Sequence, residues 1–204
     1  MPTRPSVAAA LALVAGLASA STAKAQETAD AIFAGGCFWC VEADMDKVPG
    51  VSETVSGYIG GENDDPTYEN HKAFGHYQAV RVTFDSSATS YAELLDIFLR
   101  TIDVTDDGGQ FCDRGPAYRS AIFVADDDER EAAEAAIAAA EAVLGRSVVT
   151  PVLDAPAFWP AEDYHQEYYL ENSFRYTGYR FACGRDRQVR QVWGEEAFQG
   201  LAKD

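Results

Sequence analysis

The stretch AIFAGGCFWCVEADMD, residues 31–46, decides both the fold and the chemistry expected of this chain. Its first four residues are apolar and predict a short strand, and two glycines then permit a tight turn. After the turn, Phe38, Val41 and Met45 recur at helical spacing. Cys37 therefore stands at the first turn of a helix, where free N–H groups and the positive dipole end favour a thiolate. The stretch predicts a nucleophilic cysteine, with a buried structural cysteine as the alternative.

Residues 1–25 have the composition of a cleavable signal peptide. Arg4 supplies the positive charge, residues 7–18 form an apolar run, and Ala-Lys-Ala at 23–25 matches a cleavage site; residues 18–20 offer a second one. The apolar run is too short to span a membrane. We therefore expect export of the mature chain to a bacterial periplasm or out of the cell, with an uncleaved anchor as the alternative.

The remaining residues, 26–204, are enough for one well-packed catalytic domain. The formal net charge of the whole chain is −17, and it becomes more negative when the signal peptide is removed. Such a charge argues against nucleic acid and anionic membrane surfaces as partners. We expect a monomer with no nucleic-acid partner and no membrane insertion.

The four cysteines are Cys37, Cys40, Cys112 and Cys183. In an oxidising compartment the default expectation is a pair of structural disulfides. A zinc site would need a second close pair of ligands, and only Cys37 and Cys40 lie close in sequence, so we expect no metal. The Cys-x-x-Cys spacing at a helix start is also typical of a thioredoxin-type redox pair.

The hydrophobic pattern predicts an α+β fold with the element order β-α-β-β-α-β-α-β. The expected elements are a strand at 31–34, a helix from 37, strands at 51–59 and 80–84, a helix after the capping box Ser90-x-x-Glu93, a strand at 118–125, a helix at 126–144 and an edge strand at 148–153. This order fits a ferredoxin-like split β-α-β sandwich with helices on one face of the sheet. From Phe158 we expect a long irregular C-terminal tail that wraps the sheet.

Aromatic residues near the candidate nucleophile suggest a binding pocket. Phe38 and Trp39 beside a reactive sulfur form an apolar wall suited to a small apolar group, with core packing as the alternative. Tyr68, Tyr118 and Tyr176 lie in or beside loops, and phenols there can donate hydrogen bonds to a polar oxygen. Each tyrosine taken alone can equally be structural.

Six short motifs stand in order along the chain. They are GCFW at 36–39, GYIGG at 57–61, PTY at 66–68, GHYQAV at 75–80, DRGPAYRSA at 113–121 and AEDYHQ at 161–166. Together they closely resemble the A-type peptide methionine sulfoxide reductases, over about residues 31–183.

The resemblance implies a role for each matching position. Cys37 corresponds to the nucleophile, and Phe38 and Trp39 to the wall that receives the methionine methyl group. The remaining positions bind or polarise the sulfoxide oxygen, or line the pocket: Tyr68 and Tyr118 hydrogen-bond the oxygen, Asp113 is the acid beside them, and Tyr176 is a further pocket tyrosine.

The resemblance also implies a chemistry that needs no metal or organic cofactor. The Cys37 thiolate attacks the sulfoxide sulfur of (S)-methionine sulfoxide in a peptide or protein, leaving methionine and a sulfenic acid on Cys37. A second cysteine condenses with the sulfenic acid, and a thioredoxin-like dithiol reduces the resulting disulfide.

Two departures from the family pattern matter. Gln78 stands where the family usually has a Glu that helps to protonate the oxygen, and Gln cannot give up a proton in this way. Thr177 stands where many members carry a recycling cysteine, so Cys183 is the favoured resolving residue, with Cys40 and Cys112 as alternatives. A thiol-disulfide oxidoreductase using Cys37 and Cys40, and a binding protein with all cysteines paired, are the competing hypotheses.

Overall fold

The structure is a computed structural model that describes residue 1 and residues 27–202. Nearly all of the predicted signal peptide lies outside the described residues, so cleavage and export stay predictions. Within the described residues no helix is long and apolar enough to cross a membrane.

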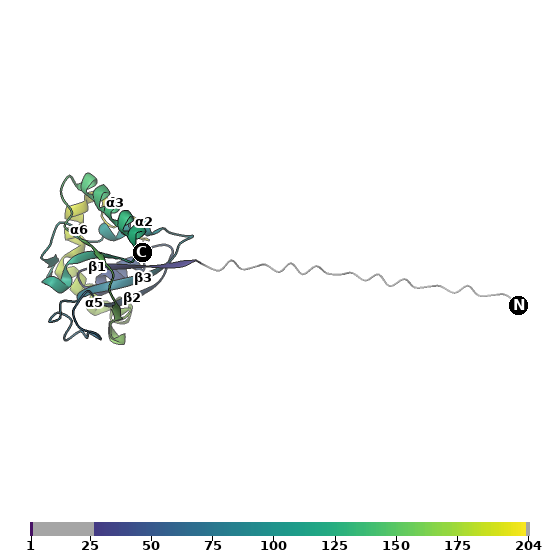
Figure 1. The fold of residues 1–204 in the computed structure, drawn as a ribbon, viewed down its shortest axis with the longest axis horizontal. Helices are drawn as coiled ribbons and strands as arrows, with labels where there is room; N and C mark the ends of the chain where they lie inside the picture. The colour runs from purple at the N-terminus through teal and green to yellow at the C-terminus, as the bar shows by residue number, and fades with distance from the viewer. Residues whose placement is uncertain (2–26, 203–204) are drawn as a thin grey trace.

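A six-stranded sheet forms the centre of the molecule (Figure 1). Its strands lie in the order β7-β6-β1-β3-β2-β8, and only the β6–β7 pair is parallel. Their bounds are β1 Thr28–Gly35, β2 Val51–Ile59, β3 Tyr77–Asp85, β6 Ser120–Val124, β7 Val152–Asp154 and β8 Phe158–Pro160. The inner order β6-β1-β3-β2 is that of a ferredoxin-like split β-α-β unit, which confirms the predicted fold class.

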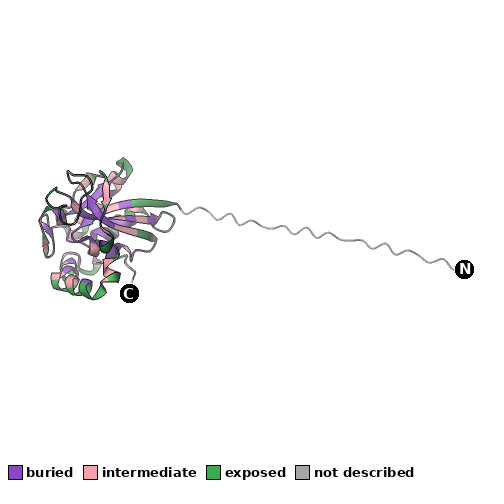
Figure 2. Ribbon diagram, turned by 90° about the horizontal axis from the view of Figure 1, so that it is seen from below, coloured by how far each residue is buried: buried purple, intermediate pink, exposed green. Residues whose placement is uncertain are grey.

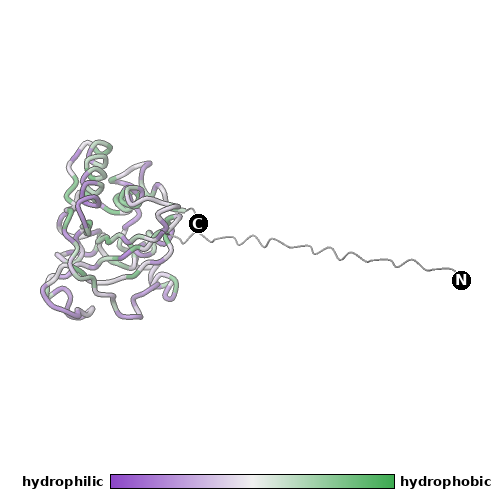
Figure 3. Tube along the Cα trace, turned by 45° about the vertical axis from the view of Figure 1, so that its right-hand side comes forward, coloured by the Kyte–Doolittle hydropathy of each residue, from purple (hydrophilic) through white to green (hydrophobic). Residues whose placement is uncertain are grey.

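Three helices cover one face of the sheet: α1 Phe38–Met45, α2 Tyr91–Leu99 and α3 Asp127–Leu144. The predicted capping box starts α2, since the Ser90 hydroxyl accepts from Glu93 N and the Glu93 carboxylate accepts from Ser90 N. Alternate residues of β3 point to opposite faces, and Val80 and Val82 pack in the main core with the helices. Figure 2 shows the buried residues gathered along the strands, and Figure 3 shows hydrophilic residues on the outlying loops.

A short polar insertion between α2 and β6 carries several candidate site residues. It consists of a two-stranded hairpin, β4 Gly109–Gln110 and β5 Asp113–Arg114, followed by the 3-10 helix η1 Pro116–Tyr118. The sequence predicts only a loop here. The hairpin is too short to show a periodicity.

The C-terminal segment is more regular than the irregular tail that the sequence predicts. It contains η2 Asp163–His165, α4 Tyr168–Glu171, α5 Ser173–Cys183, α6 Arg185–Trp193 and η3 Gly194–Glu196. Gly184, with φ +73°, ends α5 and begins α6, so the hydrophobic pattern of this segment is divided between short helices. α6 buries Val189, Trp193 and the charged Arg185, whose guanidinium donates to Gly35 O and Thr101 O. A charged residue on the buried face interrupts the apolar periodicity by which a helix is normally predicted from sequence.

Candidate active site

Cys37 lies at the junction predicted from the sequence, directly after β1 and at the N-cap of α1. Its carbonyl accepts from Cys40 N at 3.0 Å and from Val41 N at 3.3 Å, which starts the helix. Gly36 before it has φ +90°, and a Cβ there would lie 2.6 Å from Gln110 Cβ. Only glycine allows the hairpin insertion to come this close to the backbone beside Cys37.

A hollow of about 50 Å³ opens beside Cys37. Eight residues line it: Cys37, Phe38, Trp39, Tyr68, Gln78, Asp113, Tyr118 and Tyr179. Ligand pockets for whole small molecules are typically ~300–1,000 Å³, so this hollow suits one small terminal group. The structure thus brings together seven of the residues singled out from the sequence, from α1, the 66–76 loop, β3 and the hairpin insertion.

The apolar side of the hollow is held rigidly from the C-terminal segment. The Trp39 indole stacks on Tyr168 with ring centroids 3.8 Å apart, and its Nε1 donates to His165 Nδ1 at 3.1 Å. Phe38 is 1% exposed and packs against the His165 ring at 5.0 Å. These contacts fix both rings before any ligand arrives, which is what a preformed methyl-binding wall requires.

Two phenols form the polar side of the hollow. Burial raises the pKa of Tyr118 to about 12, and the negative charge of Asp113 acts in the same direction. Burial also raises the pKa of Tyr68, with a smaller contribution from the Tyr118 side chain. Both side chains therefore keep their protons at neutral pH and can donate hydrogen bonds to an oxygen placed in the hollow.

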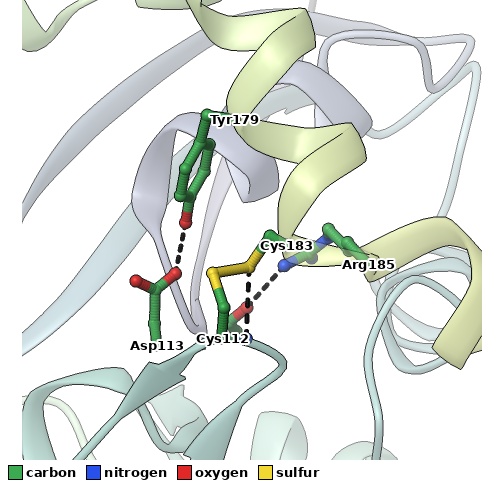
Figure 4. Close-up of a disulfide and its surroundings, with 6 residues drawn as sticks. Cys112, Asp113, Tyr179, Cys183 and Arg185 are labelled. Carbon is green, nitrogen blue, oxygen red and sulfur yellow. Dashed lines mark hydrogen bonds between the residues drawn. A yellow bond between two sulfur atoms is a disulfide. The ribbon is translucent and has the colours of Figure 1, made fainter.

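Asp113 lies beside these phenols and accepts a hydrogen bond from the Tyr179 hydroxyl (Figure 4). Burial raises the pKa of Asp113, and the Tyr179 hydrogen bond lowers it. Burial and the neighbouring Cys37 raise the pKa of Tyr179, so this phenol also stays protonated.

Tyr179 rather than Tyr176 lines the hollow. Tyr176 lies one turn earlier on α5, in a cluster with Cys37 and Cys40, and its hydroxyl accepts from Arg180 Nη1 at 2.9 Å. The sequence analysis did not identify Tyr179. Tyr176 and Tyr179 are three residues apart, and which of them faces the hollow depends on the rotation of α5, a helix that was not predicted.

Gln78 is 1% exposed and lies at the floor of the hollow. Its Oε1 accepts from Phe38 N at 3.2 Å, and its Nε2 lies 3.4 Å from His71 Nε2. The side chain therefore links α1 to the loop before β3.

The thiols of Cys37 and Cys40 are free and interact with each other. Burial raises the pKa of Cys37, and Cys40 acts in the same direction. The hydrogen bond with Cys37 lowers the pKa of Cys40, and Arg185 and Arg180 lower it further. The expectation that the helix start alone makes Cys37 a thiolate is therefore too simple, because burial opposes it. The interaction between the two thiols thus raises the pKa of Cys37 and lowers that of Cys40.

Cys112 and Cys183 form a disulfide that joins the hairpin insertion to the last residue of α5 (Figure 4). Their Cα atoms are 5.0 Å apart across 71 residues of sequence. Two of the three resolving candidates are thus bonded to each other in this structure, while Cys40 lies against Cys37. With two free cysteines, the structure also differs from a binding protein whose cysteines are all paired.

A family model described as peptide methionine sulfoxide reductase matches residues 29–197. The chain belongs to this family. It is 53% identical over 180 residues to peptide methionine sulfoxide reductase MsrA 2 of Rhizobium meliloti, covering 88% of this chain and 91% of the relative. It is 47% identical to the MsrA 2 of Caulobacter vibrioides, covering 92% of this chain and 95% of that one. The chain is therefore an MsrA-type oxidoreductase.

Solved structures of the family share the fold. Methionine sulfoxide reductase A of Corynebacterium diphtheriae superposes with a TM-score of 0.64 at 29% identity, over 72% of this chain and 76% of that one. Reduced Mxr1 of Saccharomyces cerevisiae superposes with a TM-score of 0.69 at 25% identity, over 74% and 88%.

The reductase also buries an acid that the sequence did not single out. Glu42 lies on α1 and is fully buried, and its Oε1 accepts from Glu167 N at 3.1 Å. Its second oxygen has no hydrogen-bond partner of normal geometry among the described residues. Burial raises the pKa of Glu42 to about 7, helped by the charges of Asp46 and Glu167.

Proposed function

We propose that this reductase is an exported enzyme that converts (S)-methionine sulfoxide in peptides and proteins to methionine through a sulfenic acid on Cys37. We further propose an intramolecular disulfide as the next intermediate, reduced by a thioredoxin-like dithiol. The observation that carries the proposal is that one small hollow joins a free cysteine, two fixed aromatic rings and three protonated phenols.

The hollow matches the end of a methionine sulfoxide side chain group by group. The methyl group packs against Phe38 and Trp39, which exclude water from that side. The sulfoxide oxygen, which carries partial negative charge, accepts hydrogen bonds from Tyr68 and Tyr118. The sulfur is then left facing Cys37. The apolar wall and the phenols thus bind different substituents of the same sulfur atom, the methyl group and the oxygen. This difference is the basis for the proposed epimer selectivity.

The first step transfers one oxygen atom and two electrons. The Cys37 sulfur attacks the sulfoxide sulfur and forms a transient S–S bond with it. The S–O bond and this S–S bond then break as the oxygen moves to Cys37, which leaves a sulfenic acid on Cys37 and releases methionine. The proton that the Cys37 thiol gives up ends on the transferred oxygen, so a thiol and a sulfoxide become a sulfenic acid and a thioether. Hydrogen bonds from Tyr68 and Tyr118 stabilise the charge that develops on the oxygen.

In the second step, we propose Cys40 as the resolving residue. Its sulfur already contacts that of Cys37, and condensation with the sulfenic acid forms a Cys37–Cys40 disulfide and releases water. Cys183, the favoured candidate from the sequence, would first have to leave Cys112, and it remains the alternative.

The export proposal rests on residues 1–25 and on the second pair of cysteines. Disulfides persist mainly in oxidising compartments such as the periplasm, and Cys112 and Cys183 are joined in the structure. A monomer and the absence of a nucleic-acid partner remain part of the proposal, supported by the strongly negative charge of −17.

The deciding experiment is epimer-resolved turnover of a methionine sulfoxide peptide, with dithiothreitol or with thioredoxin as reductant. We expect the S epimer alone to be consumed, and peptide mapping after one turnover to find the Cys37–Cys40 disulfide. An insulin-reduction assay run in parallel tests the competing thiol-disulfide oxidoreductase activity. Consumption of the R epimer, or insulin reduction without sulfoxide turnover, would overturn the proposal.

A further inference from the structure

His71 is a fully buried histidine in the loop between β2 and β3. Its ring stacks on Tyr58 with centroids 4.9 Å apart and packs against Tyr68 at 5.6 Å. Its main-chain N–H donates to Thr67 O at 2.8 Å, and its carbonyl accepts from His76 N, so the backbone is also held on both sides. The ring lies directly behind the hollow and is not one of the residues that line it.

The hydrogen bonds of His71 determine which ring nitrogen carries the proton. His71 Nδ1 lies 2.8 Å from Tyr68 O, and a carbonyl oxygen can only accept. The proton therefore sits on Nδ1, and Nε2 is left as an acceptor. Burial lowers the pKa of His71, which keeps the ring neutral.

The Gln78 amide completes the chain of hydrogen bonds. Phe38 N–H can only donate, so the side-chain atom 3.2 Å from it must be the amide oxygen. The amide nitrogen then faces His71 Nε2 at 3.4 Å and gives it one hydrogen. Among residues 27–202 the second hydrogen of the same NH₂ group makes no hydrogen bond to the protein, and the Gln78 side chain lines the hollow.

We propose that His71 is a positioning residue that orients the Gln78 amide so that its second N–H donates to the sulfoxide oxygen, while its Nδ1–H fixes the carbonyl of Tyr68. One imidazole thereby aligns two of the oxygen-binding groups, the amide and the Tyr68 phenol. The inference rests on the sulfoxide-binding role proposed for the hollow.

This arrangement explains how a glutamine can serve at a position where an acid is usual in the family. A glutamine cannot deliver a proton, but an oriented amide can stabilise developing negative charge on the oxygen as a hydrogen-bond donor. Removing one such donor from other enzymes costs ~10²–10³-fold in kcat. Without an acceptor at His71 Nε2, the amide would be held only by the hydrogen bond from Phe38 N to its oxygen, and part of this effect would be lost.

Two substitutions at position 71 separate the two hydrogen bonds. His71→Asn places an amide N–H near the position of Nδ1 and retains the bond to Tyr68 O, but it removes the acceptor for Gln78. His71→Gln places a side-chain oxygen near the position of Nε2 and restores that acceptor. With a methionine sulfoxide peptide and dithiothreitol, we expect His71→Asn to lower kcat about tenfold or more with KM changed less than threefold. We expect His71→Gln to recover most of the loss.

A double-substitution cycle tests whether His71 acts through Gln78. In a Gln78→Ala background the amide is gone, so His71→Asn should lower kcat less than twofold further. His76→Asn is the matched control, since His76 is 1% exposed and bonds Gly61 N and Asn63 away from the hollow. We expect it to leave kcat within twofold of wild type.

A spectroscopic measurement needs no substitution. Nitrogen-15 shifts of the His71 ring in the wild-type protein at pH 7 should show a protonated Nδ1 and an unprotonated Nε2. The opposite tautomer or an imidazolium would overturn the inference, as would an unchanged kcat in His71→Asn or an equal loss in the Gln78→Ala background. Absence of sulfoxide turnover by the wild type is a different result, which would refute the proposed function itself.

Discussion

Replacing Glu42 by Gln should stabilise the folded reductase at neutral and alkaline pH. In the folded protein burial raises the pKa of Glu42 to about 7, whereas in the unfolded chain the carboxyl ionises near 4.5. Between these two values the native state holds a proton that the unfolded state has released. The free energy of unfolding therefore falls as pH rises through this window.

The size of the effect follows from the two pKa values. A tenfold difference in acid dissociation corresponds to ~1.4 kcal/mol, so the window from 4.5 to about 7 amounts to at most ~3.5 kcal/mol. Glutamine keeps an oxygen for the Glu167 N–H and cannot ionise, so Glu42→Gln should not lose this stability. The two proteins should differ little at pH 4.5 and most above pH 7.

Urea unfolding followed by tryptophan fluorescence, at several pH values from 4.5 to 8.5, measures this directly. The control is Glu53→Gln, the same acid-to-amide change at an exposed position of β2. If the free energy of unfolding, plotted against pH, runs parallel for wild type and Glu42→Gln across the whole range, Glu42 ionises in the folded protein as it does in the unfolded chain. In that case the reasoning from its burial is wrong.

Three further predictions concern catalysis. Cys37→Ser should abolish single-turnover formation of methionine, while Cys40→Ser should retain it and stop thioredoxin-driven cycling. If Cys40→Ser formed no methionine in a single turnover, the assignment of Cys37 as the nucleophile would be wrong. Tyr118→Phe removes a donor whose pKa of about 12 keeps it protonated at neutral pH, so kcat/KM should fall ~10²-fold, and equal rates in rapid-quench assays would contradict this. Trp39→Ala should raise KM and cost about tenfold in kcat/KM, unless methyl recognition lies elsewhere.

The local parts of the fold could be predicted because their causes are local in sequence. The strand β2 has the predicted bounds of 51–59, and the Ser90–Glu93 capping box starts α2 as expected. Asp126 accepts from Glu129 N at the start of α3, as expected. The edge strand predicted at 148–153 is shorter and shifted, since β7 covers only Val152–Asp154 and Pro151 directly precedes it. In each case a few neighbouring side chains determine the backbone, and the pattern of apolar residues does the rest.

What depends on contacts between distant residues could not be predicted. Four cysteines allow three pairings, and nothing near Cys112 or Cys183 in sequence indicates that they meet. The raised pKa of Cys37 follows from burial, which the helix start does not reveal. The position of His71 behind Gln78 depends on the β2–β3 register, which joins residues far apart in the sequence.

The walls of the hollow depend on residues near the end of the chain. His165 accepts the indole N–H of Trp39, Glu162 accepts the main-chain N–H of Tyr68, and Tyr179 donates to Asp113. A ribosome makes these supporting residues last, more than a hundred positions after Cys37. A growing or truncated chain therefore carries its reactive sulfur without a site around it, and oxidised methionines become substrates only once synthesis and folding are complete.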